Sequence, residues 1–186
     1  MGRVSQAQAE ENRRRVVDTA SRLFREQGTQ VSVADLMKAA GLTHGAFYKQ
    51  FASKEALVDE ATAHAFAELA QRYSAGLERH DGQRAAARQA LIDAYLSVEH
   101  RDDPAGGCPV AALATDIARE GGGREARRVY AEGVADFADF LASDDQDGIV
   151  RLCTLFGALV LSRATKGSPL SGEILDAAHA ALSEAD

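Results

Sequence analysis

Residues 32–51 read SVADLMKAAGLTHGAFYKQF, and this stretch decides the fold because two short apolar stripes flank a glycine turn. Ser32 directly precedes the first stripe, and Asp35 follows three residues later, which is the spacing of a helix N-cap and its capping partner. Gly41 interrupts that stripe, and Thr43 can cap a second short helix. The segment therefore predicts two short helices around a turn, the form of a helix-turn-helix.

The sequence on both sides of this segment predicts further helices. A stripe that includes Val16, Ala20 and Phe24 ends at Gly28, as a helix closed by a C-terminal glycine does. Ser53 can cap a much longer apolar pattern that continues to about residue 81. Helical spacing of apolar residues then predicts helices over 83–101, 109–120, 123–142, 146–165 and 171–184. The sequence thus predicts about nine helices.

Composition supports an all-α fold and excludes several classes of protein. The chain has 37 alanines against 16 valines and isoleucines together, which favours helices over strands. No run of about 18 apolar residues occurs and residues 1–6 form no apolar signal segment, so we expect a cytoplasmic protein without a membrane partner. Cys108 and Cys153 have no zinc-binding spacing, so the sequence predicts no metal, and it suggests no cofactor.

Charge is distributed unevenly along the chain. The formal net charge is −7, but residues 13–54 hold eight basic and three acidic residues. A basic N-terminal module on an acidic body indicates a polyanionic partner for one end only.

The second helix of the opening segment is expected to expose Thr43, His44, Gly45, Tyr48 and Lys49. Small residues let a helix approach a groove, hydroxyl and imidazole groups can bond base edges or phosphates, and lysine neutralises a phosphate. The alternative is that His44 and Tyr48 belong to an ordinary solvated helix surface. Phe47 and Phe51 are assigned to packing.

Residues 12–60 resemble the N-terminal domain of the TetR/AcrR family of transcriptional repressors. The matching positions are Phe24, Gly28, Ser32-Val33, Ala40-Gly41, Gly45, Phe47-Tyr48, Phe51 and Ser53–Leu57. Thr29 departs from the pattern, which usually has an aromatic residue there. The resemblance implies a helix-turn-helix DNA-binding domain over residues 9–69 and a helical effector-binding and dimerisation domain over residues 70–186.

The same resemblance implies roles for individual residues. Ser32 would cap its helix and touch phosphate, Thr43 and His44 would meet base edges, and Tyr48, Lys49 and Lys54 would bind the DNA backbone. One such motif covers one half-site, so a palindromic operator requires a homodimer. The last two helices are the expected interface, and the alternative is that they only cap the core of the monomer.

The resemblance also implies a cavity for a small apolar or aromatic effector. The candidate lining residues are Phe66, Tyr73, Tyr95, Cys108, Leu113, Phe137 and Phe156. Ordinary core packing explains aromatic residues at helical spacing equally well. Tyr73 and Tyr95 are the stronger candidates because a buried hydroxyl needs a partner.

The two cysteines lead to different expectations. Cys108 precedes Pro109 at an expected helix start, where amide dipoles favour a thiolate, so it is either a thiol sensor of electrophiles or oxidants or a small packing residue. Cys153 lies on an apolar stripe and is expected to pack. A helical enzyme and a protein-binding scaffold are the rival classes, but no catalytic spacing supports the enzyme, and a scaffold does not need the basic segment.

Overall fold

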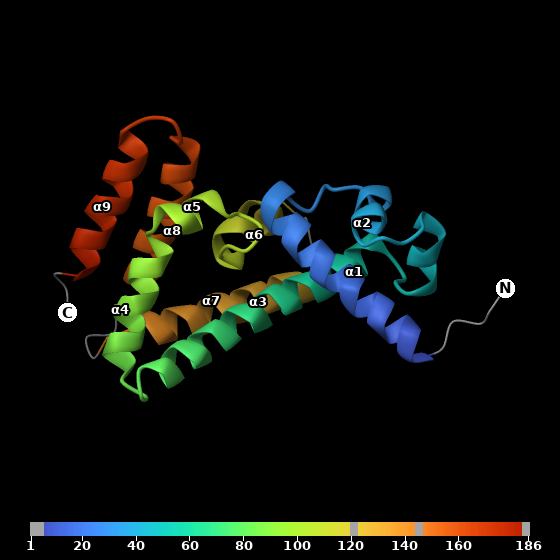
Figure 1. The fold of residues 1–186 in the computed structure, drawn as a ribbon, viewed down its shortest axis with the longest axis horizontal. Helices are drawn as coiled ribbons and strands as arrows, with labels where there is room; N and C mark the ends of the chain where they lie inside the picture. The colour runs from blue at the N-terminus through green and yellow to red at the C-terminus, as the bar shows by residue number, and fades with distance from the viewer. Residues whose placement is uncertain (1–5, 120–122, 144–146, 184–186) are drawn as a thin grey trace.

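The structure is a computed structural model that describes residues 6–119, 123–143 and 147–183, and over these residues it is helical without a strand (Figure 1). The elements are α1 (Gln6–Gln27), α2 (Val33–Ala39), η1 (His44–Lys49), α3 (Lys54–Arg79), α4 (Arg84–Tyr95), α5 (Val98–Asp102), α6 (Pro109–Ala118), α7 (Arg124–Leu141), α8 (Gly148–Ala164) and α9 (Leu170–Ser183). The all-α prediction is therefore confirmed.

Two departures from the expected helices concern short segments. The second helix of the helix-turn-helix is a 3-10 helix, η1, which suits a six-residue element with a glycine inside it. The helix expected over 83–101 is two helices, because α4 ends at Tyr95 and Ser97 starts α5 by accepting a bond from the amide of His100 at 3.1 Å. The expected helix ends at residues 120, 146 and 184 lie outside the described residues.

We call α1, α2, η1 and the first half of α3 the N-terminal lobe. Its core is a continuous cluster in which Phe24, Phe47 and Leu57 are almost fully buried. Gly28 closes α1 with a φ of +83° and donates its amide to the carbonyl of Phe24 at 3.0 Å. This left-handed backbone conformation favours glycine, which explains why residue 28 is a glycine.

The rest of the chain forms the C-terminal lobe around a second cluster, which includes Ile92, Phe137 and Leu155. α3 and α7 run side by side along the molecule, and α8 and α9 lie at the end opposite α2 and η1 (Figure 1). At Gly133 of α7 an added Cβ would lie 2.1 Å from the ring of Phe66 on α3. Glycine there lets the two helices approach closely.

α3 belongs to both lobes, because its first turns pack in the N-terminal cluster and Phe66 packs in the other. Leu113 and Ile117 of α6 also pack in the N-terminal cluster. The boundary expected between residues 69 and 70 falls within α3, and the division into two domains stays a prediction. Among the described residues, no helix is long and apolar enough to cross a membrane.

Candidate nucleic-acid interface and effector cavity

η1 presents one side to solvent and the other to the core. Thr43, His44, Gly45 and Lys49 are exposed, and Tyr48 is 65% exposed. Phe47 points inward and stacks on Phe51, with 5.4 Å between the ring centroids. The predicted set of exposed residues is thus brought together on one short element whose inner face is fixed by packing.

Gly45 and Tyr48 shape this surface differently. A Cβ added at Gly45 would meet nothing within 4 Å in the described part of the chain, so the surface is open there. The ring of Tyr48 lies edge-on to that of His44, with centroids 5.8 Å apart. The two rings are therefore in contact beside the open backbone at Gly45, which a groove wall can approach closely.

Arg13 of α1 supports η1 from behind, and the sequence analysis missed it. Its guanidinium lies 4.3 Å from the centroid of the Phe51 ring, donates to the carbonyl of Gln50, and pairs with Glu60. Arg13 thus joins the end of η1 to both α1 and α3. Only its place in the basic segment distinguished it in the sequence, because its three partners come from other elements.

Ser32 is exposed but its hydroxyl is engaged in the cap of α2, and Lys54 is partly buried. The hydroxyl of Ser32 accepts from the amide of Asp35 at 3.1 Å and donates to the Asp35 carboxylate at 2.6 Å, so its capping role is confirmed. Lys54 is half-buried, and burial lowers its pKa, although Asp116 partly opposes that change. Both phosphate contacts stay predictions.

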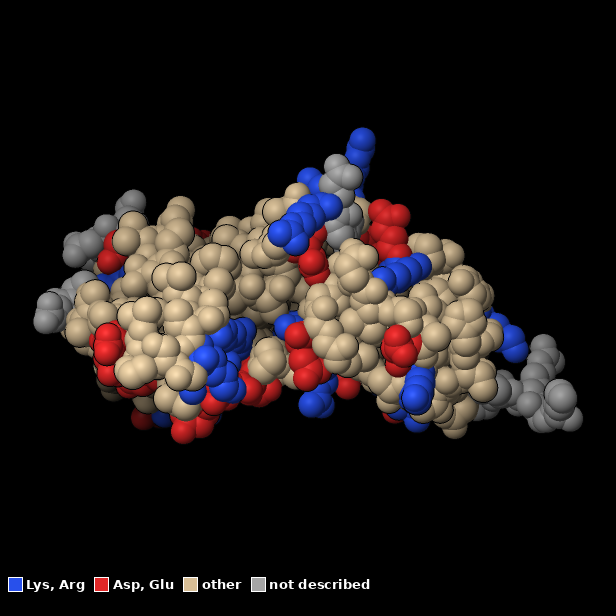
Figure 2. Space-filling view, turned by 90° about the horizontal axis from the view of Figure 1, so that it is seen from above, with Lys and Arg blue, Asp and Glu red and all other residues tan. Residues whose placement is uncertain are grey.

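The basic residues of the N-terminal lobe do not gather into one patch on the face that Figure 2 shows. In Figure 2 the basic side chains over the N-terminal lobe are scattered and interleaved with acidic ones, without one continuous basic patch on the face in view. Several arginines of α1 are engaged locally, as in the pair between Arg14 and Glu11 at 3.4 Å. The net excess of basic residues is therefore spread over the lobe.

The C-terminal lobe contains a cavity of about 540 Å³ between α3, α4 and α7. Four of the seven candidate residues line it, namely Tyr73, Tyr95, Cys108 and Phe137. Further lining residues that the sequence did not single out include Leu69, Arg72, Leu91, His100 and Phe140. Its size and mainly apolar wall suit a small molecule.

The other three candidates lie outside this lining. Phe66 packs edge-on against Tyr130, with centroids 5.6 Å apart, and Leu113 belongs to the core of the N-terminal lobe. Phe156 of α8 is partly buried against the C-terminal core. Helical spacing marked them as inward-facing, but it could not say which part of the interior each one reaches.

The polar groups of the cavity lining range from exposed charged side chains, such as Arg72 and Glu99, to the buried hydroxyls of Tyr73 and Tyr95. The hydroxyl of Tyr73 has no hydrogen-bond partner within the described residues, that of Tyr95 lies against the Cys108 thiol, and burial raises the pKa of both tyrosines. The ring of Tyr73 stacks on Phe137 and Phe140. The Nδ1 atom of His100 lies 2.7 Å from the carbonyl oxygen of Tyr95, and burial lowers the pKa of His100. A ligand that hydrogen-bonds the Tyr73 hydroxyl would satisfy a group that the described residues leave unpaired.

The structure buries Cys108, which favours the packing alternative, and exposes Cys153. Cys108 caps α6 but is buried, and burial raises the pKa of its thiol despite the opposing amides of Val110 and Ala111. Cys153 is exposed, so the expectation that it packs in the core is wrong. α8 has apolar residues on two faces, and the spacing alone does not show which face is inside.

The outer face of α8 is apolar and uncovered. Ile149 and Val150 are 72% and 66% exposed, and Val160 and Leu161, about three turns further along α8, are 39% and 55% exposed. Together with Cys153 they form one stripe along the helix, which we call the α8 surface. Monomeric proteins seldom leave so many large apolar residues exposed on one element.

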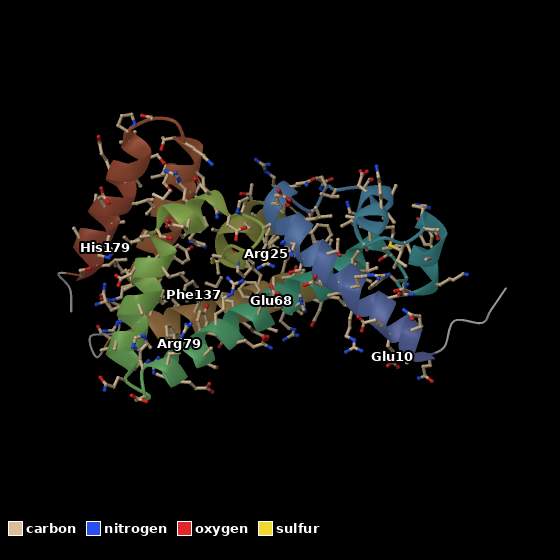
Figure 3. The ribbon with its side chains drawn as sticks, in the orientation of Figure 1. Glu10, Arg25, Glu68, Arg79, Phe137 and His179 are labelled. Atoms are coloured by element: carbon tan, nitrogen blue, oxygen red, sulfur yellow. The ribbon has the colours of Figure 1, made fainter. Side chains whose placement is uncertain are left out.

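Arg25 connects the N-terminal lobe to the wall of the cavity (Figure 3). Its guanidinium is buried, pairs with Glu68 at 2.8 Å and donates to the carbonyl of Gly107 at 3.2 Å. Gly107 is followed directly by the cavity residue Cys108. A displacement of this wall can therefore reach α1 through one side chain.

Comparison with known proteins agrees with this architecture. Residues 16–61 match the family described as bacterial regulatory proteins, tetR family. The HTH-type transcriptional regulator AcrR of Shigella flexneri is 41% identical over 61 residues, which are 32% of this chain and 28% of that regulator's length.

Two solved structures share the fold over nearly the whole chain. The reduced form of E. coli NemR is 19% identical and has a TM-score of 0.78 over 94% of this chain and 96% of its own. A TetR transcriptional regulator from Chloroflexus aurantiacus is 23% identical, with a TM-score of 0.78 over 96% of both chains. At these identities the likeness shows the fold alone.

Proposed function

Because the chain belongs to the TetR/AcrR family of transcriptional regulators, which is not a family of enzymes, we propose that it represses transcription by binding a palindromic operator as a homodimer. The observation that carries this proposal is η1, whose exposed side gathers Thr43, His44, Gly45, Tyr48 and Lys49 over a packed core. In a helix-turn-helix, residues at the start of the second helix contact base edges while flanking groups hold the DNA backbone.

Gel-shift titration with the DNA that flanks its own gene tests operator binding. We expect a complex with one fragment that survives excess unrelated DNA, and we expect His44→Ala to alter the sequence preference by about 1–3 kcal/mol per lost base contact. Equal affinity for all fragments at fixed salt would contradict an operator, and uniform weakening by His44→Ala would show that it only positions η1.

The α8 surface supports the homodimer. Two copies that pack these stripes together would bury apolar side chains that one copy leaves in water, and a symmetric pair matches a palindromic site. Leu161→Asp should shift sedimentation toward the monomer at micromolar protein. Val98→Asp is the matched control, because Val98 is 49% exposed but lies outside the α8 surface. A monomer in the unmodified protein would refute the dimer.

The cavity supports release by a small apolar or aromatic effector. A ligand lowers operator affinity only to the extent that it binds the two states of the protein differently. Aromatic compounds that raise the midpoint of thermal unfolding, and lose that effect in Tyr95→Phe, would be tested in the gel shift. Compounds that bind but leave operator affinity unchanged would contradict release. Sensing through the Cys108 thiol is the second candidate, favoured by its place in the lining but opposed by its raised pKa.

A further inference from the structure

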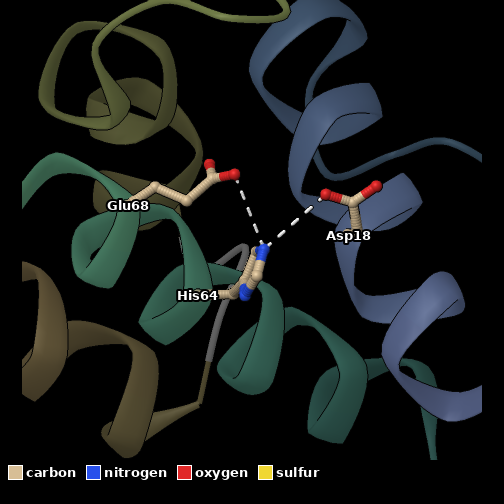
Figure 4. Close-up of side chains that lie close together, drawn as sticks. All are labelled: Asp18, His64 and Glu68. Atoms are coloured by element: carbon tan, nitrogen blue, oxygen red, sulfur yellow. Dashed lines mark ion pairs between the residues drawn. The ribbon is translucent and has the colours of Figure 1, made fainter. Parts of the chain in front are cut away.

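Three side chains that can bind a metal ion meet at the junction of α1 and α3 (Figure 4). The Nε2 atom of His64 lies 3.7 Å from Oδ1 of Asp18 and 3.6 Å from Oε1 of Glu68. One ligand atom from each residue lies within 4.8 Å of the other two. His64 and Glu68 are four residues apart on α3 and so share a face, while Asp18 comes from α1.

The imidazole nitrogen between these carboxylates is unsatisfied. The His64 side chain is 37% exposed, but its Nε2 atom is shielded from solvent and finds no hydrogen-bond partner among the described residues. The distances to Asp18 and Glu68 are too long for hydrogen bonds. Three atoms therefore converge on a space that none of them fills.

That space has nearly the dimensions of a coordination site. With metal–ligand bonds of about 2.1 Å in a tetrahedral arrangement, two ligand atoms lie about 3.4 Å apart. The separations of 3.6 and 3.7 Å at His64 are close to that value. Asp18 is 52% exposed, so its carboxylate can move to close the remaining gap to Glu68.

The surroundings hold the ligands and leave a route for an ion. The other oxygen of Glu68 accepts from Arg25 at 2.8 Å, which directs Oε1 toward His64, as second hydrogen bonds do for ligating carboxylates. A surface hollow beside Asp18 and His64 also contains Arg13, Arg14 and Arg15. Arg13 and Arg14 pair with Glu60 and Glu11, and Arg15 donates to the Asn12 side chain at 3.2 Å. The hollow borders both Asp18 and His64, and the half-exposed Asp18 carboxylate is the ligand that an incoming ion meets first.

We propose that Asp18, His64 and Glu68 bind a divalent transition-metal ion of the zinc type through one nitrogen and two oxygen atoms, with water completing the coordination. An imidazole ligand favours zinc, nickel or copper over magnesium and calcium, which prefer oxygen ligands alone. This site is independent of the cysteines on which the sequence prediction of no metal was based. An ion there would join α1 of the N-terminal lobe to α3.

Calorimetric titration of chelator-treated Cys153→Ser protein with zinc chloride tests the site, and the exposed cysteine is removed so that it cannot bind zinc. We expect one equivalent bound at neutral pH and at least a tenfold loss of affinity in His64→Ala and in Asp18→Asn. His179→Ala is the matched control, because His179 also pairs with a carboxylate, that of Asp93 at 2.8 Å. Cobalt(II) in place of zinc should give visible absorption that His64→Ala abolishes.

Zinc binding that is absent, or that His64→Ala and Asp18→Asn leave unchanged, would overturn the proposal and leave the three side chains as a polar cluster without a metal ion. Circular dichroism in chelator would establish that the variants are folded. If the proposed operator binding is also correct, zinc should change operator affinity in the Cys153→Ser protein but not when His64→Ala is added. The calorimetry needs no DNA, so failure of operator binding and failure of the metal site are distinguishable.

Discussion

Replacing Arg25 by methionine tests whether one buried guanidinium holds the two lobes together. Its side chain is 2% exposed and donates to Glu68 and to the carbonyls of Gly107 and Ser21. Methionine retains much of the apolar volume but forms none of these bonds. Removing one partner of a buried ion pair lowers the free energy of unfolding by about 3–5 kcal/mol, because the other charge is left unpaired.

The structure places the expected loss at the lower end of that range. Glu68 is 29% exposed, so water restores part of its solvation, and we expect a loss of about 3 kcal/mol. For a chain of this size, such a loss lowers the midpoint of thermal unfolding by about 6–12 °C. Burial lowers the pKa of Arg25 more than Glu68 raises it. Because the double variant Arg25→Met, Glu68→Met leaves no unpaired charge, it should recover at least half of the lost free energy of unfolding.

Urea unfolding followed by circular dichroism gives the comparison. Arg22→Met is the matched control, because Arg22 is on the same helix but exposed. The reasoning is refuted if the free energies of unfolding of Arg25→Met and Arg22→Met agree within about 1 kcal/mol, the range of ordinary surface substitutions. It is also refuted if the double variant is less stable than Arg25→Met alone.

Three further outcomes are expected. Lys49→Ala should lower the salt slope of operator binding by about one unit, and the half-buried Lys54→Ala by less; unchanged slopes in both would remove them from the interface. Iodoacetamide at pH 8 should modify exposed Cys153 before buried Cys108, as peptide mass spectrometry would show, and the reverse order would favour thiol sensing. Because burial lowers the pKa of His100, the stability it contributes is complete above about pH 6.5 and is lost as the pH falls through its lower native pKa. His100→Asn should therefore flatten the fall of the urea midpoint below pH 7, and an equal fall in both proteins would count against this.

The sequence specified the elements that depend on local chemistry. Ser32 and Ser53 cap α2 and α3 as predicted, and Gly28 closes α1, since each signal lies within four residues of the backbone that it controls. The break between α4 and α5 was not predicted because Ala94, Tyr95 and Val98 continue the apolar spacing across it. Only the bond from the His100 amide to Ser97 shows that a new helix starts there.

The candidate sites were predictable only where one segment carries them. Exposed residues of η1 were found because they are nearly consecutive. Only part of the cavity lining was predicted. Spacing shows that Phe66, Leu113 and Phe156 turn inward, but not which part of the interior each one reaches. Phe66 meets Tyr130, Leu113 packs in the N-terminal cluster, and Phe156 packs against the C-terminal cluster. Burial by groups distant in sequence raises the pKa of the Cys108 thiol, so this shift could not be inferred from its helix-start position.

The carboxylate of Glu68 links the proposed metal site to the wall of the cavity. Its Oε2 atom holds Arg25, which reaches the carbonyl of Gly107 beside the cavity, and its Oε1 atom faces His64. An effector that displaces Gly107 therefore changes the position of Arg25 and with it the orientation in which Glu68 meets a metal ion. Since coupling between two binding equilibria is reciprocal, the factor by which such an effector changes zinc affinity must equal the factor by which zinc changes effector affinity. Replacing Arg25 by methionine should bring both factors toward one, whereas a coupling that survives the substitution would have to pass through the α3 backbone instead.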